Sequence, residues 1–446
     1  MSDLPRSEAE RLAVTGAART RARAAVAGSI AILLLLGVVA VRNAFTYPAI
    51  GGYDAQEYVT YAEGVVDGRL PDGVGVYHTP PGYPAAAGAA VEIGRLLDLR
   101  DPEHLGQLVS ALAVIATGVI VLLLARLLWP ARPVLWLAAV GFFAFLPVVL
   151  KSGAMFHPEP LGMLLTAAAL LVLARLVRAR DYSWWLAVVL GLLLGLGQLV
   201  RAWSLWMVAV AVVVLAAVAL TERASRRRVL GSLVIVVAIA AVVPAPWYVH
   251  QATQYSNPVF NREQPDTFVL ARRPLSFYLD ARVPDVVERP WSGRFNDRFW
   301  PVLYAETWGD YFGIWSWGTG RGDRTDAIDA TLARQSVLGI LPSGLALSGV
   351  IALLGLAVTR PREDVGRLLV ALPPAAAVAS ILYLSVAYPS SDGDTIKGTY
   401  ALAAAPAVAL CFGFAVDVLA RSRLVGIVLG GALAATALAI LPFLVW

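Results

Sequence analysis

A carboxylate-bearing turn and helix follow the first apolar run of the chain. Residues 51–61 read Gly-Gly-Tyr-Asp-Ala-Gln-Glu-Tyr-Val-Thr-Tyr, which predicts a glycine turn and then a short helix. In that helix Asp54, Glu57 and Tyr58 share one face, because residues three or four apart are neighbours on a helix surface. A carboxylate among aromatic rings can accept the proton of a hydroxyl that attacks an electrophilic carbon. We therefore predict Asp54 as a general base and Glu57 and Tyr58 as substrate contacts; the alternative is that Asp54 only caps the helix.

Three cationic side chains lie where a membrane edge is expected. Arg201 separates two apolar runs, Lys397 precedes another, and Lys151 follows one. Placing a cation at such a depth costs free energy, so its presence there indicates a function. A cation can stabilise a phosphate whose negative charge grows as its bond to carbon breaks. We predict that Arg201, Lys397 and Lys151 bind a phosphate. The alternative is that these side chains extend to the lipid headgroups.

Four further polar residues are expected to line the same site. His157 and Glu159 occur in His-Pro-Glu-Pro, directly before an apolar run. Glu159 either favours the helix N-terminus electrostatically or takes part in the site, and at lipid depth it needs a partner such as an arginine. His78 lies in Tyr-His-Thr-Pro-Pro-Gly-Tyr-Pro, and Asp310 lies in a segment rich in tryptophan and tyrosine. We predict substrate contacts for His78, His157, Glu159 and Asp310.

The same residues raise the question of a bound metal. The conceivable ligands of a divalent cation are His78, His157, Asp54 and Glu159. However, the histidines form no HxxxH pair, and the single cysteine, Cys411, lies in an apolar run and excludes a thiolate cluster or a disulfide. We therefore expect no metal or other cofactor, and a divalent metal is the alternative.

The composition shows which elements must position these residues. Of the 446 residues, 58% are hydrophobic and only 15% are charged, a balance that a water-soluble domain does not have. Runs of about 20 apolar residues recur, which is the length of a helix that crosses a bilayer. They are continuous rather than alternating, so helices and not strands satisfy the backbone. The sequence predicts an all-α integral membrane protein.

About eleven transmembrane helices are expected. Their positions are 24–41, 106–128, 133–149, 159–177, 184–200, 203–220, 228–248, 337–358, 367–387, 400–420 and 424–445. Arginines cluster in alternate connections, which places those connections and the N-terminal tail, residues 1–23, in the cytoplasm. The net charge of +5 is then a consequence of topology, and no nucleic-acid partner is expected.

Two long polar segments are expected on the opposite, extracytoplasmic side. The first, residues 42–105, belongs to an N-terminal transmembrane module, residues 24–248, and its stretch 85–97 predicts a helix in the membrane interface. The second is a large outer loop, residues 249–336, which precedes a C-terminal transmembrane module, residues 337–446. The candidate site residues all lie on this side, so the chemistry is expected outside the cytoplasm.

The order of these motifs resembles the GT-C superfamily of membrane glycosyltransferases, and within it the protein O-mannosyltransferase and aminoarabinose transferase branch. The resemblance rests on segments 52–58, 78–84, 157–161, 195–201 and 397–402, in that order along the chain. It implies a GT-C fold, a sugar donor linked to polyprenyl phosphate, and transfer with inversion of the anomeric centre. It also implies Asp54 as the base and Arg201 and Lys397 at the donor phosphate. One departure is that two residues separate Asp54 from Glu57, where the mannosyltransferases carry adjacent acids.

The residues and the resemblance together predict a glycosyltransferase of the plasma membrane. It would move a sugar from a polyprenyl phosphate to a glycan, lipid or protein acceptor on the extracytoplasmic face. Nucleotide sugars are cytosolic, so an outer site needs a donor that the bilayer carries. Only Lys151 and Lys397 among the 36 basic residues are lysines, a bias typical of a GC-rich bacterial genome.

Two other classes of protein share the hydrophobic pattern. One is a transporter or flippase of lipid-linked sugar, and the other is a non-catalytic lipid-binding membrane protein. A transporter should bury charges at mid-membrane, whereas the polar residues of this chain lie towards the outer edge. This distribution favours the enzyme.

Overall fold

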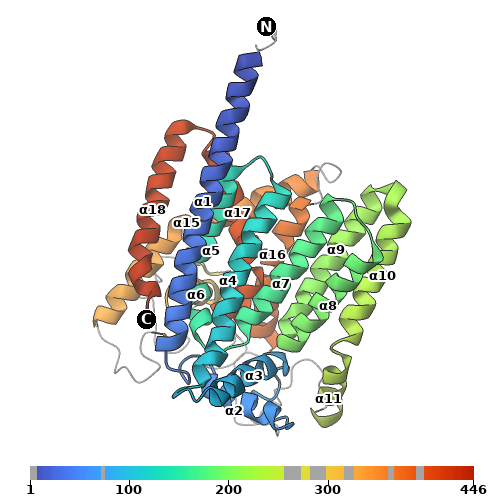
Figure 1. Cartoon of the computed structure of the whole chain (residues 1–446), viewed down its shortest axis with the longest axis vertical. Coiled ribbons are helices and arrows are strands. Elements are labelled where there is room, and N and C mark those ends of the chain that lie inside the picture. The colour runs from blue at the N-terminus through green and yellow to red at the C-terminus, as the bar shows by residue number, and fades with distance from the viewer. Residues whose placement is uncertain are drawn as a thin grey trace.

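The computed structural model is a bundle of long helices with two shorter helices across one end (Figure 1). It describes residues 8–71, 76–255, 273–281, 298–315, 326–359, 366–387 and 396–446. Every regular element within these ranges is a helix, which confirms the expected all-α class.

The long helices occupy the positions expected of transmembrane spans. They are α1 (Glu8–Thr46), α4 (Glu103–Leu128), α7 (Glu159–Arg178), α8 (Trp184–Val200), α9 (Leu205–Thr221), α15 (Asp326–Thr359), α16 (Gly366–Ala387), α17 (Ala405–Leu419) and α18 (Arg423–Leu444). In the described part of the chain eight helices are long and apolar enough to cross a membrane, or up to ten if two bent pairs each count as one span. The protein is therefore a multi-pass membrane protein. The expected number of about eleven is not confirmed, because α8, at 17 residues, is shorter than the eight.

Two expected spans are broken next to prolines. α5 (Pro133–Phe145) and α6 (Pro147–Ala154) meet at 51°, and the pair α10 (Arg226–Val242) and α11 (Ala245–Tyr255) is bent by 44°. Proline lacks the N–H of a helix interior and forces the residue before it into an extended conformation, as Leu146 shows with ψ of 113°. The sequence predicts Lys151 beyond the end of a span at residue 149. That prediction is wrong, because Pro147 starts a second helix and Lys151 lies buried inside it.

Two short helices cover the end of the bundle at which α1 finishes. α2 (Ala55–Val66) and α3 (Gly82–Leu96) lie across it (Figure 1). Their buried faces form a small hydrophobic core with Phe156 and Val200, at the ends of the spans above. The helix expected over 85–97 is thus present as α3. From the large outer loop the structure describes α12 (Leu275–Leu279) and α14 (Phe299–Trp308); much of the rest lies outside the described residues.

Arginine-bearing turns lie at the end of the bundle opposite α2 and α3 (Figure 1). Arg132, between α4 and α5, lies 3.4 Å from an Asp417 carboxylate oxygen, and Arg180, after α7, lies 3.1 Å from Glu222. This segregation agrees with the positive-inside rule. The assignment of this end to the cytoplasm stays a prediction.

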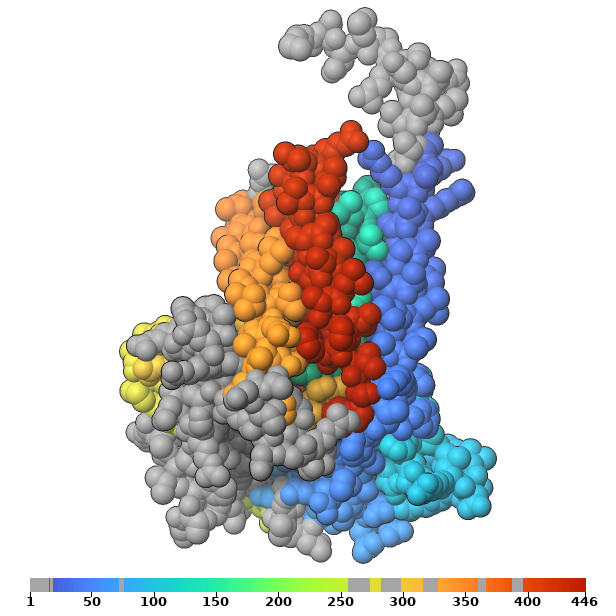
Figure 2. All heavy atoms as spheres, turned by 90° about the vertical axis from the view of Figure 1, so that its left-hand side faces the viewer, coloured from blue at the N-terminus to red at the C-terminus, as the bar shows by residue number. Residues whose placement is uncertain are grey.

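α18 lies on the outside of the bundle beside α1 (Figure 2). Its end is held by hydrogen bonds: the Asn43 side-chain amide donates to the Leu444 carbonyl at 2.6 Å, and the Trp446 N–H donates to the Asn43 side-chain oxygen Oδ1 at 3.0 Å. The Trp446 ring also packs edge-on against Tyr47. The body of α18 buries little of its surface, so this helix is anchored at its end and packed loosely along its length.

Candidate active site

The turn before α2 holds Asp54 in an uncommon backbone conformation. Gly52 has a φ of 108° and Asp54 a φ of 52°, and few residues other than glycine adopt positive values. A Cβ at position 52 would lie 2.8 Å from the Met155 sulfur, so glycine permits this close approach. Asp54 occupies the N-cap position of α2, but its side chain makes no capping hydrogen bond. The capping alternative is therefore wrong, and the turn directs the carboxylate to another partner.

That partner is Lys397. Its Nζ lies 3.8 Å from Asp54 Oδ2; the Lys397 side chain is 3% exposed and the Asp54 side chain 45%. The ammonium also lies 4.6 Å from the centre of the Tyr53 ring, a distance at which an aromatic face attracts a cation. Lys397 directly precedes a 3-10 helix, Gly398–Ala404, that leads into α17. The pair therefore combines a buried cation with an acid that faces water.

Arg201 is held by Glu159 where two helix ends meet. Glu159 is the first residue of α7, and Arg201 directly follows α8. The guanidinium Nε and Nη2 lie 2.7 and 2.6 Å from Glu159 Oε1, and Nη1 donates to the Thr79 hydroxyl at 3.2 Å. Both charged side chains are buried. The arginine partner expected for Glu159 is thus confirmed.

One aromatic ring, that of Tyr400, connects the two cations. The Arg201 Cζ lies 5.6 Å and the Lys397 Nζ 5.8 Å from its centre. Stacking on one ring keeps the two positive side chains close without bringing them into direct contact. A phosphate between Arg201 and Lys397 would meet positive charge on two sides.

His157 and Tyr58 lie beside these cations. The His157 ring packs edge-on against Tyr58, with ring centres 5.4 Å apart, and the Tyr58 hydroxyl lies 3.4 Å from that of Thr79. Burial lowers the pKa of His157 well below its usual range, and the positive charges of Arg201 and Lys397 lower it further. The imidazole is therefore neutral. Its Nδ1 has no hydrogen-bond partner among the described residues, so a polar substrate group can take that place.

Lys151 and Asp310 lie in an adjoining buried group. The Lys151 ammonium donates to the Gly309 carbonyl at 2.5 Å and interacts electrostatically with Asp310 and Glu306. All three side chains are buried. Lys151 thus does not extend to the lipid headgroups; it offsets the charge of acids from the outer loop.

Glu306, which is not among the residues predicted from the sequence, links this group to Tyr53, the residue before Asp54. Its carboxylate accepts hydrogen bonds from the Tyr53 hydroxyl and from the Phe312 backbone N–H, the latter at 3.1 Å. Burial raises the pKa of Glu306 to about 7, and the negative charge of Asp310 adds to the rise. An acid in an otherwise apolar, aromatic helix was the available signal, because a buried carboxylate needs partners.

Glu57 lies near Asp54, and His78 is the residue before Thr79, which binds Arg201. Glu57 is exposed while Tyr58 is buried, and Asp54 precedes the helix, so the predicted face shared by these three residues is wrong. Burial raises the pKa of Glu57, and the charge of Asp54 raises it further, which shows that the two carboxylates are near each other. The His78 ring packs against Tyr77, with ring centres 5.7 Å apart. Across the described ranges, no three His, Cys, Asp or Glu side chains gather in a way that could hold a metal ion.

We expect Glu306 to make the stability of the protein depend on pH. Its folded pKa of about 7 lies above the ordinary value of 4.5, so the native state binds this proton more tightly than the unfolded chain. The resulting stabilisation is complete below pH 4.5 and is lost as the pH rises through 7. Thermal unfolding in detergent at pH 5 and pH 8 should show a smaller difference in Tm for Glu306→Gln than for the parent; an equal difference would contradict the assignment.

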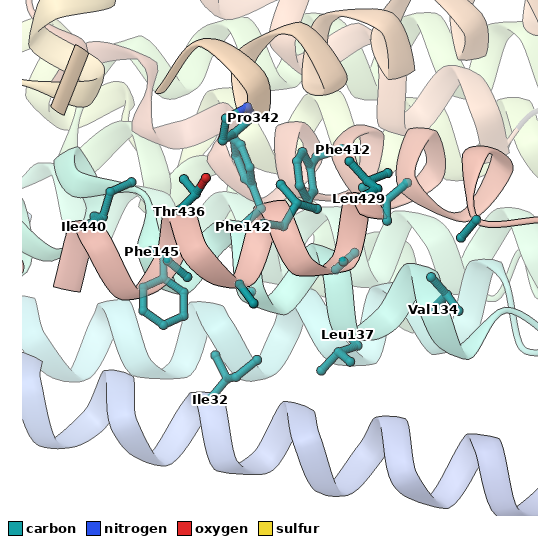
Figure 3. Close-up of a pocket in the computed structure, with 18 of the residues that line it drawn as sticks. Ile32, Val134, Leu137, Phe142, Phe145, Pro342, Phe412, Leu429, Thr436 and Ile440 are labelled. Atoms are coloured by element: carbon teal, nitrogen blue, oxygen red, sulfur yellow. The ribbon is translucent and has the colours of Figure 1, made fainter. Parts of the chain in front are cut away.

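An apolar cavity of about 320 Å³ lies between α18 and the bundle. Figure 3 shows its wall, with Ile32 from α1, Phe142 from α5, Phe412 from α17 and Leu429 from α18. Among the described residues that line it, Thr436 contributes the one hydroxyl. A second cavity, of about 220 Å³, shares Phe142 and Trp308 with the first and is bounded by Gly398, the residue after Lys397. The two cavities therefore adjoin at Phe142 and Trp308, and the smaller one reaches the residue next to Lys397.

Comparisons with known proteins identify the architecture. The whole bundle is similar to an oligosaccharyltransferase from Archaeoglobus fulgidus tethered with an acceptor peptide, with a TM-score of 0.54 and 13% identity over 92% of this chain and 54% of that one. The same enzyme in complex with an inhibitory peptide and a dolichol-phosphate gives a TM-score of 0.51, with 14% identity and the same coverage. ArnT from Cupriavidus metallidurans bound to undecaprenyl phosphate gives 0.41, with 16% identity over 89% and 78% of the two chains. The similarity to the oligosaccharyltransferase shows the GT-C fold that the ordered motifs predict, and this chain spans about half the length of that enzyme.

A family model matches part of the chain. Residues 85–248 match the model of the dolichyl-phosphate-mannose-protein mannosyltransferases. The matched segment contains Glu159 and Arg201 but not Asp54 or Lys397. A comparison with curated protein sequences finds no match.

Proposed function

We propose that this protein is a glycosyltransferase that takes a sugar from a polyprenyl phosphate at the extracytoplasmic face of the plasma membrane. The observation that carries the proposal is the arrangement of Arg201, Lys397 and Asp54: two buried cations stack on one tyrosine, and a partly exposed carboxylate adjoins one of them. Cations suit the phosphate of the donor, and the carboxylate suits the hydroxyl of the acceptor.

The reaction is a single displacement at the anomeric carbon. The acceptor hydroxyl attacks this carbon, its proton passes to the Asp54 carboxylate, and the bond from the carbon to the phosphate oxygen breaks. The electron pair of that bond stays on the lipid phosphate, where Arg201 and Lys397 stabilise the growing negative charge. Attack opposite to the leaving group inverts the anomeric centre, and the acceptor is a glycan, a lipid or a protein.

The surrounding residues hold the cations before the donor arrives. Glu159 and Thr79 fix the orientation of the Arg201 guanidinium, so little reorganisation is needed when a phosphate binds. The neutral His157 ring and Tyr58 fill the space beside them and can hydrogen-bond to the sugar. Lys151 and Asp310 support the outer-loop side of the site. Glu57 lies near Asp54, and His78 precedes Thr79.

The fold supports a donor of this kind. The similar archaeal oligosaccharyltransferase binds a dolichol-phosphate, which is a polyprenyl-type lipid phosphate. The match to the mannosyltransferase model covers the segment that supplies Arg201 and Glu159. In the present chain the two apolar cavities offer a path for the hydrocarbon: a chain that leaves a phosphate at Lys397 meets the smaller cavity beside Gly398 and then the larger one under α18.

Turnover separates this proposal from the transporter and the lipid-binding protein. Purified protein is mixed with a radiolabelled polyprenyl-phosphate sugar and a panel of glycan, lipid and peptide acceptors, and label is followed from the donor to an acceptor. Transfer supports the enzyme. Binding of the donor without any transfer across the panel would contradict it and favour the lipid-binding alternative.

A bulky side chain in the larger cavity is expected to discriminate between donors by chain length. Gly430 lines the cavity on α18, and a Cβ there meets no atom within 4 Å, so Gly430→Trp adds an indole without a clash at the backbone. Displacing two or more buried CH₂ groups of a long chain, at about 0.8 kcal/mol each, should raise KM for a long polyprenyl donor about tenfold or more. KM for a donor with two isoprene units should not change.

The neighbouring Gly431 provides the matched control. A Cβ there also meets no atom within 4 Å, but Gly431 does not line the cavity. Gly431→Trp should leave both KM values unchanged. If Gly430→Trp leaves KM for the long donor unchanged, or alters both donors alike, the chain does not follow this path.

A further inference from the structure

Glu306 contacts the chain neighbours of both reactive residues. Tyr53 immediately precedes Asp54, and its hydroxyl donates to Glu306. Gly398 immediately follows Lys397, and a Cβ at this position would lie 2.8 Å from both the backbone carbon and the backbone oxygen of Glu306. Glu306 thus contacts the backbone of Gly398 next to Lys397 and the side chain of Tyr53 next to Asp54.

The Tyr53 ring completes the connection. Its hydroxyl is bound by Glu306, and its face lies 4.6 Å from the Lys397 ammonium. A rotation of this ring would therefore move the surface on which the cation rests. It would also pull on the left-handed turn at Asp54, which has little freedom because positive φ values are sparsely populated.

Glu306 is itself held in place from several sides. Its second oxygen accepts the Phe312 N–H at 3.1 Å, and Lys151 binds the carbonyl of Gly309 one turn further along the chain. On α14, Phe299 and Val302 are fully or almost fully buried. Because the Glu306 side chain is fixed, it can fix the position of Tyr53, which a mobile, solvent-exposed acid could not do.

From this geometry we infer that Glu306 is a positioning residue, which acts through Tyr53 and Gly398 to set the distance between Asp54 and Lys397. This inference rests on the proposed function, in which Asp54 serves the acceptor and Lys397 the donor phosphate. Glu306 touches neither substrate in this scheme. Instead, Glu306 sets the distance between Asp54 and Lys397, which do contact the substrates in this scheme.

The charge of Glu306 matters because only the carboxylate accepts both hydrogen bonds without a competing proton. Burial, and then the charge of Asp310, raise the pKa of Glu306 to about 7. The hydrogen bonds from Tyr53 and Phe312 and the charge of Lys151 lower this pKa. Among the described residues, Lys397 lies over the Tyr53 ring and pairs with Asp54, so both of these charges are also close to this connection. We therefore expect kcat to rise with pH through 7.

A double-mutant cycle tests the inference. Tyr53→Phe removes the hydroxyl but keeps the ring under Lys397, and Glu306→Ala removes the acceptor. Each should lower kcat by roughly 10–100-fold, as a misplacement of about 1 Å can, while KM for the donor changes less than threefold. Because both changes break one connection, the double variant should be no worse than the poorer single variant. Glu306→Gln keeps one oxygen for Tyr53 but is neutral and cannot accept both hydrogen bonds, so its kcat should stay near the low-pH value of the parent and should not rise around pH 7.

A matched control and a readout without turnover complete the design. Tyr248→Phe removes a different tyrosine hydroxyl bond, the part-buried one to Gln198, and should leave kcat unchanged. Hydrogen exchange of peptides that cover 51–57 and 396–400 should quicken in Tyr53→Phe and Glu306→Ala but not in the control. Additive losses of kcat, or unchanged exchange in both peptides, would overturn the inference. If the parent transfers no sugar, the proposed function fails, while the exchange experiment still decides whether Glu306 positions the two segments.

Discussion

Asp54→Asn is expected to abolish transfer while leaving the protein folded and able to bind the donor. Asparagine has the same shape and tolerates positive φ, so the turn at Gly52 should persist, but the amide cannot accept the proton of the acceptor hydroxyl. Loss of a general base lowers kcat by about 10²–10⁴-fold. The measurement is kcat with a polyprenyl-phosphate sugar, with donor affinity determined separately by equilibrium binding.

Asp98 supplies a close control for this substitution. It is the only other aspartate with a positive φ in the described residues, at 53°, and it is exposed at the end of α3. Asp98→Asn makes the same chemical change in the same backbone conformation, so it should leave kcat unaltered. Full activity in Asp54→Asn would remove Asp54 from the mechanism, whatever the result at Asp98.

Arg201→Ala is expected to have a second large effect, on both stability and donor binding. It leaves Glu159 buried without its cation, and breaking one side of a buried ion pair destabilises a protein by about 3–5 kcal/mol. It also removes a charged hydrogen-bond donor from the phosphate, worth about 1.5–3 kcal/mol, or about 10–100-fold in Kd. Thermal unfolding and equilibrium binding of the donor measure the two effects.

A neutral double variant separates stability from binding. In Glu159→Gln with Arg201→Gln the two amides can hydrogen-bond to each other, so most of the lost stability should return. Donor affinity should not return, because no cation remains at this position. Recovery of affinity together with stability would show that Arg201 only supports the fold.

The ion pair at the opposite end of the bundle serves as the comparison. Arg132 lies 3.4 Å from Asp417, and its side chain is 32% exposed, so the pair contributes at most about 1 kcal/mol. Arg132→Gln should therefore shift Tm little and leave donor affinity unchanged. If Arg132→Gln lost as much donor affinity as Arg201→Ala, the loss in Arg201→Ala could not be attributed to the candidate active site.

Much of the fold could be predicted because bilayer physics acts on short stretches of sequence. A span needs about 20 apolar residues wherever it occurs, so each expected position contains a helix. The breaks were not predicted, although Pro147 was visible, because a proline in a membrane helix produces either a kink or a new helix according to its neighbours. That choice buried Lys151 in α6 instead of leaving it at the surface.

The residue types of the candidate site were visible in the sequence, but their arrangement only in part. A glutamate at a membrane edge requires a partner, so an arginine beside Glu159 could be expected from the cost of an isolated charge. That this arginine is Arg201 was decided by the structure. No local rule links Asp54 with Lys397, which are separated by most of the chain. Nor could helical periodicity show that Asp54 precedes α2 in a left-handed turn.

The sequence by itself determined that the chain enters a membrane, which end carries the arginines, and which few polar residues are available for chemistry. These are properties of composition and spacing, and they hold whatever the packing. The tertiary structure alone decided that Tyr400 joins Arg201 to Lys397 and that Glu306 reaches Tyr53 from the outer loop. Such contacts depend on how helices distant in sequence pack together, and that packing is a property of the whole bundle rather than of any one segment.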